Sequence, residues 1–309
     1  MSYKQIIRMR DVENRQVGGY HHPQSRPRKP LKVSARQYAA QLLRGRLTTR
    51  DLELARALIG VGLLTRHQIQ RLFFGDHAKV TANRLTKLYD YHFLDRSPYW
   101  LEEMGAEGFE TCYIYTLGVT GLEAFALNSG MTRQEVPFSP QRYTLSRGDH
   151  LLLHDLRISE MFTRLRVGTE GFGWELVWFN ESAAMLCRGE EELVRPDGIA
   201  VLMGGERQVA FFVEMDRGHT NWESKVEFYE RARRQSAWRE TLRVDNWQPA
   251  VYPAVLCVVP REIETKVYTA VRRQRPQTPF YAKTWETFLT TEMFGGWVEG
   301  VSGDKTRLV

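Results

Sequence analysis

The stretch Arg195–Tyr229, RPDGIAVLMGGERQVAFFVEMDRGHTNWESKVEFY, contains two runs typical of β-strands, separated by the turn Gly204-Gly205-Glu206. The first run opens with Pro196-Asp197, and the second ends with Glu214-Met215-Asp216. Because successive side chains of a strand point to opposite faces, Phe212 is expected to share its face with Glu214 and Asp216. The sequence therefore predicts a β-hairpin with acidic side chains gathered at one end.

A helix is expected to begin a short turn after this hairpin. Thr220 is a candidate N-cap, and Glu223 is the acid three residues later that would complete a capping box. Lys225 lies early in this helix, and its spacing places Phe228 and Tyr229 on the same helical face. These aromatic neighbours indicate that the face packs on the sheet.

A buried ammonium group needs an anion beside it. Asp197, Glu214 and Asp216 are the acids that could lie beside Lys225. Converging carboxylates repel one another unless a cation lies among them, which favours either a metal ion or Lys225 at this point. Carboxylate oxygens suit Mg²⁺ and Mn²⁺, so these four residues are candidate catalytic residues for metal-dependent phosphate chemistry. The alternative is a structural cluster of salt bridges.

The length and composition indicate a globular protein of two domains. The chain has 309 residues, and its 42% of hydrophobic residues are enough for a substantial core. No apolar run approaches the roughly 20 residues of a membrane span, and the N-terminus has no apolar signal core. Cys112, Cys187 and Cys257 form neither a zinc pattern nor a disulfide framework. We therefore expect a cytoplasmic protein with reduced cysteines and no membrane partner.

Positive charge is concentrated near the N-terminus. Residues 1–50 contain twelve Lys and Arg but two acids, a net charge of +10, whereas the whole chain carries +6. The remaining 259 residues therefore sum to −4. A basic arm ahead of a nearly neutral body favours a nucleic-acid partner, and a solubilising tail is the alternative. Residues 1–35 are expected to form this basic flexible arm.

Three helical patterns follow one another between Thr48 and Tyr91. Apolar residues at helical spacing predict helices near 49–60, 65–74 and 79–91, with glycines between them. Strand patterns come next, of which Thr111–Leu117 is the clearest. Three short helices followed by a β-hairpin are typical of a winged helix-turn-helix domain, which we place at residues 36–130.

The third of these helices would lie in the major groove of double-stranded DNA. Its side chains outside the core are of the types that contact phosphates and base edges. They are the candidate DNA-binding residues Lys79, Thr81, Asn83, Arg84 and Lys87. The alternative is a winged helix that contacts another protein and leaves this polar face in solvent.

The second half of the chain, residues 148–309, reads as an α/β domain after a linker at 131–147. Its patterns follow the order helix, three strands, helix, strand, helix and strand, which predicts a sheet with helices on its faces. The run Ala254–Val259 is continuously apolar, as in a buried parallel strand. No Gly-rich phosphate loop with its Lys-Ser/Thr occurs, so neither a nucleotide nor an organic cofactor is indicated.

The order of elements, with Pro196-Asp197 on one strand and Glu214-x-Asp216 on the next, resembles the PD-(D/E)XK nuclease-like superfamily. The winged-helix pattern followed by Arg195–Gly198 and Phe212–Gly218 resembles the replication-relaxation family of plasmids and integrative elements of Gram-positive bacteria. This resemblance covers about residues 48–290. It implies an α+β fold, an N-terminal winged helix-turn-helix followed by a nuclease-like α/β domain with a mixed sheet. It also implies a role in replication, relaxation or mobilisation of DNA.

The resemblance carries site residues with it. In the nuclease superfamily, an acid after the proline and an acid on the next strand bind a divalent metal ion, and Asp197 and Glu214 match them. Glu160 lies on the preceding helix, where some nucleases have a further metal ligand. Asp216 occupies the position of the superfamily's lysine, and Lys225 from the following helix is the candidate replacement. Mg²⁺ or Mn²⁺ is therefore implied at Asp197 and Glu214.

Three functions are open on these grounds. The first is a DNA-binding protein of a plasmid or mobile element, whose nuclease-like domain contacts DNA or replication and mobilisation proteins. The second is a Mg²⁺-dependent DNA endonuclease or nickase. The third is an assembly adaptor without affinity for DNA.

Overall fold

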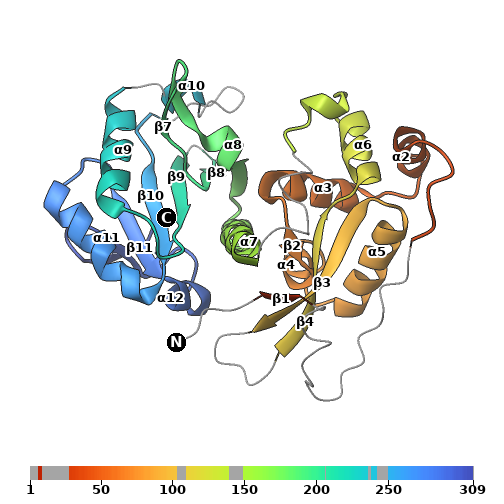
Figure 1. The fold of residues 1–309 in the computed structure, drawn as a ribbon, viewed down its shortest axis with the longest axis horizontal. Coiled ribbons are helices and arrows are strands. Elements are labelled where there is room, and N and C mark those ends of the chain that lie inside the picture. Colours follow the sequence, from red (N-terminus) through yellow and green to blue (C-terminus); the bar gives the residue numbers. More distant parts are fainter. Residues whose placement is uncertain are drawn as a thin grey trace. The chain divides into compact units, whose positions relative to one another are not determined.

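The computed structural model describes residues 6–8, 28–102, 109–138, 149–205, 207–235, 238–241 and 250–308. The chain forms two compact units, Met1–Thr163 and Arg164–Val309, whose elements are labelled in Figure 1. The division falls within helix α7 (Asp149–Glu170). Among the residues described, no helix combines the length and the apolar composition that crossing a membrane requires.

The first turns of α7 belong to the core of the first unit. Leu152 and Leu156 are buried in one cluster with Leu63 and Ile114. Ser159 also donates a hydrogen bond of 2.5 Å to the backbone oxygen of Leu63. Residues 139–147 of the predicted linker lie outside the described residues, and the division between the two units falls after Thr163.

The first unit combines helices with an antiparallel sheet of order β1-β3-β4-β2. Three of its helices, α3 to α5, begin and end within two residues of the bounds that the sequence predicts. The elements are β1 (Ile6–Arg8), α2 (Ala35–Leu43), α3 (Thr49–Val61), β2 (Leu64–Thr65), α4 (Arg66–Phe73), α5 (Ala78–Asp90), β3 (Leu94–Glu102), β4 (Phe109–Leu117), α6 (Val119–Asn128) and η1 (Arg133–Glu135).

Side-chain hydrogen bonds fix where α3 and α4 begin. Thr48 and Asp51 form a capping box at α3, and Thr65 and Gln68 form another at α4. Each box satisfies backbone N–H groups that the first turn of a helix leaves without partners. Gly62, at φ 80°, ends α3 in a left-handed conformation that glycine adopts readily.

Asp51 also joins α3 to α5. Its carboxylate accepts a hydrogen bond of 2.9 Å from Nε of Arg84 and pairs with the Nη2 of the same guanidinium. Nη2 of Arg84 donates a second bond, of 2.9 Å, to the backbone oxygen of Arg46. Asp51 is 1% exposed, and its hydrogen bond raises the pKa of Arg84 against the opposing effect of burial. Arg84 thus holds α5 against the start of α3.

Two segments of the predicted flexible arm, residues 1–35, are docked on β3. Ile6–Arg8 forms strand β1 and pairs with Tyr99–Leu101. Arg28 forms an ion pair of 2.6 Å with Asp95, and its guanidinium lies 4.5 Å from the centroid of the Tyr89 ring. Backbone pairing and a cation–π contact hold segments that composition alone indicated as flexible. Residues 1–5 and 9–27 lie outside the described part of the chain.

The second unit is built on a mixed seven-stranded sheet of order β13-β12-β11-β10-β9-β8-β5. Strands β9, β10 and β11 are parallel, and the other neighbours are antiparallel. The predicted α+β class with a mixed sheet is confirmed. After α7, the elements are β5 (Glu175–Asn180), α8 (Glu181–Ala184), β6 (Leu186–Arg188), β7 (Glu191–Val194), β8 (Gly198–Gly204), β9 (Arg207–Met215), α9 (Trp222–Arg234), α10 (Trp238–Thr241), β10 (Ala254–Val259), α11 (Arg261–Gln274), β11 (Phe280–Thr284), α12 (Trp285–Thr290), β12 (Trp297–Glu299) and β13 (Lys305–Thr306).

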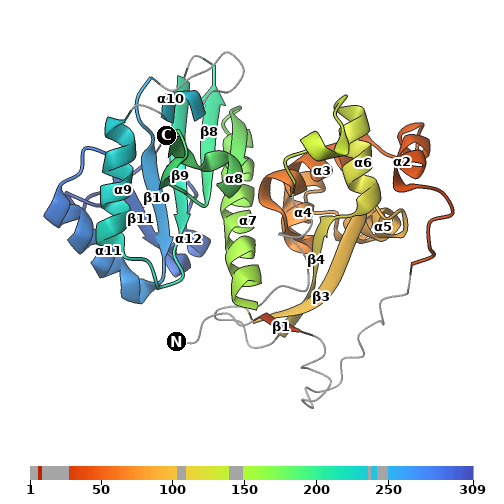
Figure 2. The same ribbon diagram turned by 45° about the horizontal axis from the view of Figure 1, so that its top comes forward.

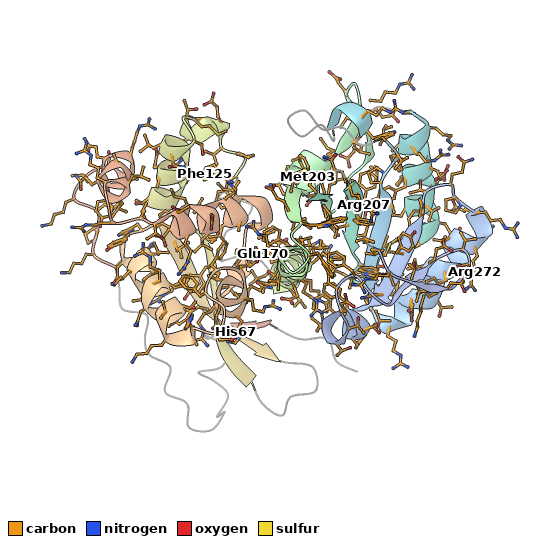
Figure 3. All side chains as sticks on the ribbon, turned by 180° about the vertical axis from the view of Figure 1, so that it is seen from behind. His67, Phe125, Glu170, Met203, Arg207 and Arg272 are labelled. Carbon is orange, nitrogen blue, oxygen red and sulfur yellow. The ribbon has the colours of Figure 1, made fainter. Side chains whose placement is uncertain are left out.

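Helices α9 and α11 lie side by side over one face of this sheet (Figure 2). Tyr229 of α9 and Val267 of α11 belong to one apolar core with Phe212, Val255 and Cys257 of the strands. Charged side chains lie on the outer side of the helices, and Figure 3 labels one of them, the exposed Arg272 of α11. The face of α9 that meets the sheet is therefore fixed by apolar burial.

Two cations hold the end of α12. Arg164 of α7 donates hydrogen bonds to the backbone oxygens of Leu289, at 3.0 Å, and Thr291, at 2.6 Å. Lys283 of β11 donates to the hydroxyl of Thr291 at 3.1 Å and to the backbone oxygen of Glu292 at 2.9 Å. Positive charge at this end of a helix offsets the partial negative charge of its last carbonyls. Burial lowers the pKa of Lys283 to about 8.

Replacing Asp51 by Ala should destabilise the first unit strongly. The substitution removes the capping box of α3 and leaves the guanidinium of Arg84 without its carboxylate, a loss of about 3 kcal/mol. Urea unfolding, monitored through amide hydrogen exchange in α3 and α5, measures this loss of stability. Glu53→Ala, which removes an exposed acid from the same helix, is the matched control and should change stability by less than about 0.5 kcal/mol. Equal effects of the two variants would contradict the role of Asp51.

Candidate functional site

Asp197 and Glu214 lie beside each other at one end of the β8–β9 hairpin. Gly198 is paired with Val213, so Asp197, the residue before Gly198, lies next to Glu214. The backbone N–H of Asp197 donates to the oxygen of Val213 at 3.0 Å. The N–H of Met215 donates to Oδ2 of Asp197 at 2.7 Å. The structure thus brings together the two acids that the sequence predicts as metal ligands.

Lys225 reaches the same point from α9. Its Nζ lies 2.8 Å from Oε1 of Glu214, and the hydroxyl of Tyr229 donates a hydrogen bond of 2.5 Å to the same oxygen. Lys225 and Tyr229 are four residues apart, so they approach the carboxylate from one side of the helix. Both contacts use Oε1, and Oε2 of Glu214 has no protein partner among the described residues.

Burial controls the charges of this cluster. Burial raises the pKa of Glu214 to about 7, against the opposing effects of Lys225 and Tyr229, and the charge of Asp197 adds to the rise. Burial and the Glu214 carboxylate also raise the pKa of Tyr229 well above its usual range, so its hydroxyl remains a donor. Burial acts to lower the pKa of Lys225, but Glu214 and Asp197 raise it overall. Lys225 therefore remains an ammonium group.

The carboxylate of Asp216 accepts hydrogen bonds from the turn between β9 and α9 and from the start of α9. Its Oδ1 accepts hydrogen bonds from the N–H of Gly218, at 2.7 Å, and from the hydroxyl of Thr220, at 2.9 Å. Its Oδ2 accepts a bond of 2.7 Å from Nε1 of Trp222. Asp216 is 4% exposed and directly follows β9, and its described side-chain hydrogen bonds all serve the turn.

The start of α9 differs from the sequence prediction. Asn221, whose side chain accepts from the N–H of Ser224, is the N-cap. Thr220, the predicted cap, lies one residue before this N-cap and donates its hydroxyl to Asp216 instead. The predicted partner Glu223 forms an ion pair of 2.8 Å with Arg273. The prediction of a capping box was wrong because a buried acid outside the helix competes for the Thr220 hydroxyl.

The buried stripe of α9 also differs in part. Phe228, predicted to pack on the sheet, is 42% exposed, and Arg231 lies 5.6 Å from its ring centroid. The buried positions are Trp222, Val226, Tyr229 and Ala232. The helix is therefore rotated so that Tyr229 takes the core position and Lys225 lies at its border.

Gly198 completes the motif that begins at Pro196. A Cβ atom at this position would lie 2.5 Å from the ring of Trp178 on β5, which is too close for any side chain. Trp178 pairs with Ala200 and thus lies on the strand next to Asp197. The glycine after Asp197 therefore leaves room for the Trp178 ring of the neighbouring strand β5 to lie against β8.

Glu160 has partners in the first unit. Its Oε2 lies 2.5 Å from Nη2 of Arg71 and accepts a hydrogen bond of 3.1 Å from Nε2 of Gln68. Both partners belong to α4. Glu160 belongs to the first unit, whereas Asp197 and Glu214 belong to the second, and its ion pair with Arg71 accounts for its position.

The five candidate DNA-binding residues divide into two sets. Lys79, Asn83 and Lys87 are exposed on α5 at spacings of four residues, so they lie along one face. Thr81 is fully buried, and its hydroxyl donates to the backbone oxygen of His77 at 2.9 Å. Arg84 is held by Asp51, as described above. The sequence shows that all five residues are polar, but it did not separate the three exposed residues from the buried Thr81 and from Arg84, which binds Asp51.

Tyr229 and Asp51 are site-forming residues that sequence reasoning missed. Tyr229 follows Lys225 by one helical turn, a spacing that could have indicated a shared partner. Asp51 follows Thr48 by three residues, the spacing of a capping box, but its second bond to Arg84 joins residues far apart in the chain. That contact has no signal in the sequence.

The acids fit a hard divalent cation. Asp197 and Glu214 offer carboxylate oxygens, and Mg²⁺ typically binds one or two carboxylates while it keeps several waters. In the described residues, no group of three or more Asp, Glu, His or Cys is placed to hold a metal ion. An ion at Asp197 and Glu214 would therefore take water or phosphate oxygens as its other ligands.

The raised pKa of Glu214 predicts a pH dependence of stability. The folded state keeps the proton of Glu214 up to about pH 7, whereas an exposed Glu in the unfolded chain releases it at its ordinary pKa of 4.5. This contribution to stability is present below about pH 4.5 and is lost as the pH rises to 7. Glu214→Gln, compared with the unchanged protein in urea unfolding from pH 4 to 8, should lack that loss. Parallel profiles would contradict the raised pKa.

Comparison with known families assigns the chain to one of them. The family model described as replication-relaxation matches residues 56–244, more than half of the sequence. The matched range contains α5 and the segment from Asp197 to Lys225. No curated protein and no solved structure matches the chain. The chain belongs to the replication-relaxation family.

Proposed function

We propose that this protein binds double-stranded DNA of a plasmid or mobile element through a winged helix-turn-helix in its first unit. Membership of the replication-relaxation family indicates a role in the replication or relaxation of such DNA. The order of α3, β2, α4, α5, β3 and β4 is the order of helices and strands expected of a winged helix. In this arrangement, α5 is the helix that enters the major groove.

The exposed face of α5 is the observation that carries this proposal. Lys79, Asn83, Thr86 and Lys87 are exposed along it, and none of them has an ion-pair partner in the described residues. Lysines suit phosphate oxygens, and an asparagine can pair with the edge of adenine. The face therefore offers both positioning contacts and a base contact.

Two further cations extend this face. Arg46 lies in the turn whose backbone oxygen accepts a hydrogen bond from Arg84 of α5. Arg50, at the start of α3, lies over the ring of Phe74, the residue that ends α4, at 4.8 Å. Both arginines are exposed and form no ion pair among the described residues. They are suited to bind the DNA backbone beside the groove that α5 enters.

The double variant Lys79→Ala/Lys87→Ala should weaken binding of duplex DNA by about tenfold or more at physiological salt. The slope of log affinity against log salt should fall by about 2, because about one counterion is released for each phosphate that a lysine neutralises. Fluorescence anisotropy on a labelled duplex at several salt concentrations measures both quantities. Arg84 is unsuitable for this test, because its substitution would also release α5 from Asp51.

Lys266→Ala/Lys305→Ala is the matched control. These exposed lysines lie on α11 and β13, and their removal changes the net charge by the same amount. The control should retain affinity and salt dependence. Equal loss in the two double variants would reject α5 as the contact surface. Absence of duplex binding by the unchanged protein would instead support an adaptor without affinity for DNA.

A second candidate function is metal-dependent cleavage of one or both DNA strands, and the convergence of Asp197, Glu214 and Lys225 favours it. Asp197 and Glu214 would hold Mg²⁺ or Mn²⁺, which would activate water and neutralise charge on the phosphate. Lys225 is placed to donate a hydrogen bond to a phosphate oxygen or a water molecule at the site. Tyr229 holds the Glu214 carboxylate in place by its hydrogen bond.

Nicking of supercoiled plasmid in the presence of Mn²⁺ tests this second function. Asp197→Asn and Glu214→Gln should each abolish nicking and weaken Mn²⁺ binding measured by calorimetry. Lys225→Met should abolish nicking while it retains Mn²⁺ binding, because both carboxylates remain. Glu160→Gln serves as the comparison for the predicted third metal ligand and should leave both quantities unchanged. Nicking that persists in Asp197→Asn would reject the site.

A further inference from the structure

We infer that Asp216 is a positioning residue, which fixes the turn between β9 and α9 so that Lys225 is held against Glu214. The inference rests on the second proposed function for its chemical meaning, because it concerns the same carboxylates and lysine. Asp216 stands where the nuclease superfamily has its lysine, two residues after Glu214 and directly after the end of β9. The carboxylate of Asp216 accepts three hydrogen bonds at that position.

The bonds of Asp216 span the whole turn. They reach Gly218 and Thr220 within it and Trp222 at the first position of α9. Gly218 has a φ of 97°, which lies in the left-handed region and lets its N–H point back to the carboxylate. Asp216 is itself fixed by its backbone N–H, which donates to the oxygen of Val258 on β10 at 3.0 Å. The sheet therefore fixes the turn through one carboxylate.

Trp222 transmits this constraint to the helix. Its indole nitrogen bonds to Asp216, and its side chain is 3% exposed in the core between α9 and the sheet. Lys225 follows Trp222 by three residues and lies on the adjoining side of the helix. A slip of one residue would move Lys225 by 1.5 Å along the axis and rotate it by about 100°. Such a slip would break its contact of 2.8 Å with Glu214.

Apolar packing alone does not fix this register as tightly. Val226, Tyr229 and Ala232 determine which face of α9 meets the sheet. Apolar contacts are not directional, whereas three hydrogen bonds to one buried carboxylate require particular donors at particular distances. Lys225 of α9 thus takes the place of the lysine that is absent after β9. Asp216, which stands at the position of that lysine, fixes where α9 begins.

A double-mutant cycle tests the positioning role. Glu214→Gln, Lys225→Met and the double variant are made with Asp216 and again with Asp216→Ala, and urea unfolding of the second unit is followed by tryptophan fluorescence. With Asp216, the coupling between the two positions should change the unfolding equilibrium constant by about tenfold or more. With Asp216→Ala, this factor should fall to near one. An unchanged factor would overturn the inference.

Milder variants keep the test decisive if Asp216→Ala does not fold. Thr220→Val removes one donor to Asp216, and Trp222→Phe removes another while it keeps an aromatic ring in the core. Each should lower the coupling factor, and Thr220→Ser, which keeps the hydroxyl, should restore it. Thr269→Val removes a comparable hydroxyl bond on α11, to the oxygen of Thr265, and is the matched control. Equal coupling in Thr220→Val and Thr269→Val would contradict the inference.

The cycle separates this inference from the proposed cleavage activity. If the unchanged protein does not nick DNA with Mn²⁺, the second proposed function fails, but loss of coupling in Asp216→Ala still supports positioning. If the protein does nick DNA, Asp216→Ala should reduce nicking in proportion to the lost coupling and retain binding of Mn²⁺. Loss of Mn²⁺ binding with full coupling would show that Asp216 is a metal ligand and would overturn the positioning role.

Discussion

The buried carboxylate of Glu214 is the constraint on which the second unit depends. An ionised group that leaves water loses several kcal/mol of solvation unless charge and hydrogen bonds replace it. Here Lys225 and Tyr229 supply both from one helix, and they converge on a single oxygen. Apolar burial fixes which face of α9 meets the sheet, and on that helix Lys225 and Tyr229 lie one turn apart beside Glu214. Asp216 holds the turn between β9 and α9 through its hydrogen bonds to Gly218 and Trp222.

The first unit also contains a buried carboxylate that is neutralised by a cation from a neighbouring helix, and there the pair joins two helices. Asp51 is buried at the start of α3, and Arg84 neutralises it from α5. A charged residue on an amphipathic helix can either face a partner or hold the helix to its own domain. Arg84 does the second, so the exposed polar face of α5 is narrower than composition indicates and consists of Lys79, Asn83, Thr86 and Lys87. The fixed position of α5 in turn places Arg46 beside that face.

The sequence predicted what depends on periodicity and local spacing. The hairpin ending in Glu214 and the helix carrying Lys225 follow from strand and helix patterns, whereas the mixed sheet was implied by the family resemblance. The structure brings Asp197, Glu214 and Lys225 together. It failed where two local signals compete for one group. Thr220 is a good N-cap by type, yet a buried acid takes its hydroxyl. The rotation of α9 likewise depends on tertiary packing, which decides between Phe228 and Tyr229 for the core.

The state of Lys225 links the structure of the site to its chemistry. Without another cation, its ammonium group is the positive charge that the buried Glu214 carboxylate requires. Asp197 and Glu214 would hold a divalent ion, which would supply part of that neutralisation. Two positive charges on one carboxylate repel each other, so the ion would weaken the hold of Glu214 on Lys225. The ammonium group would then be available to a phosphate oxygen, on a helix whose start Asp216 still fixes. Positioning through the turn, rather than through the ion pair, is what would keep Lys225 at the site once its first partner has bound a metal.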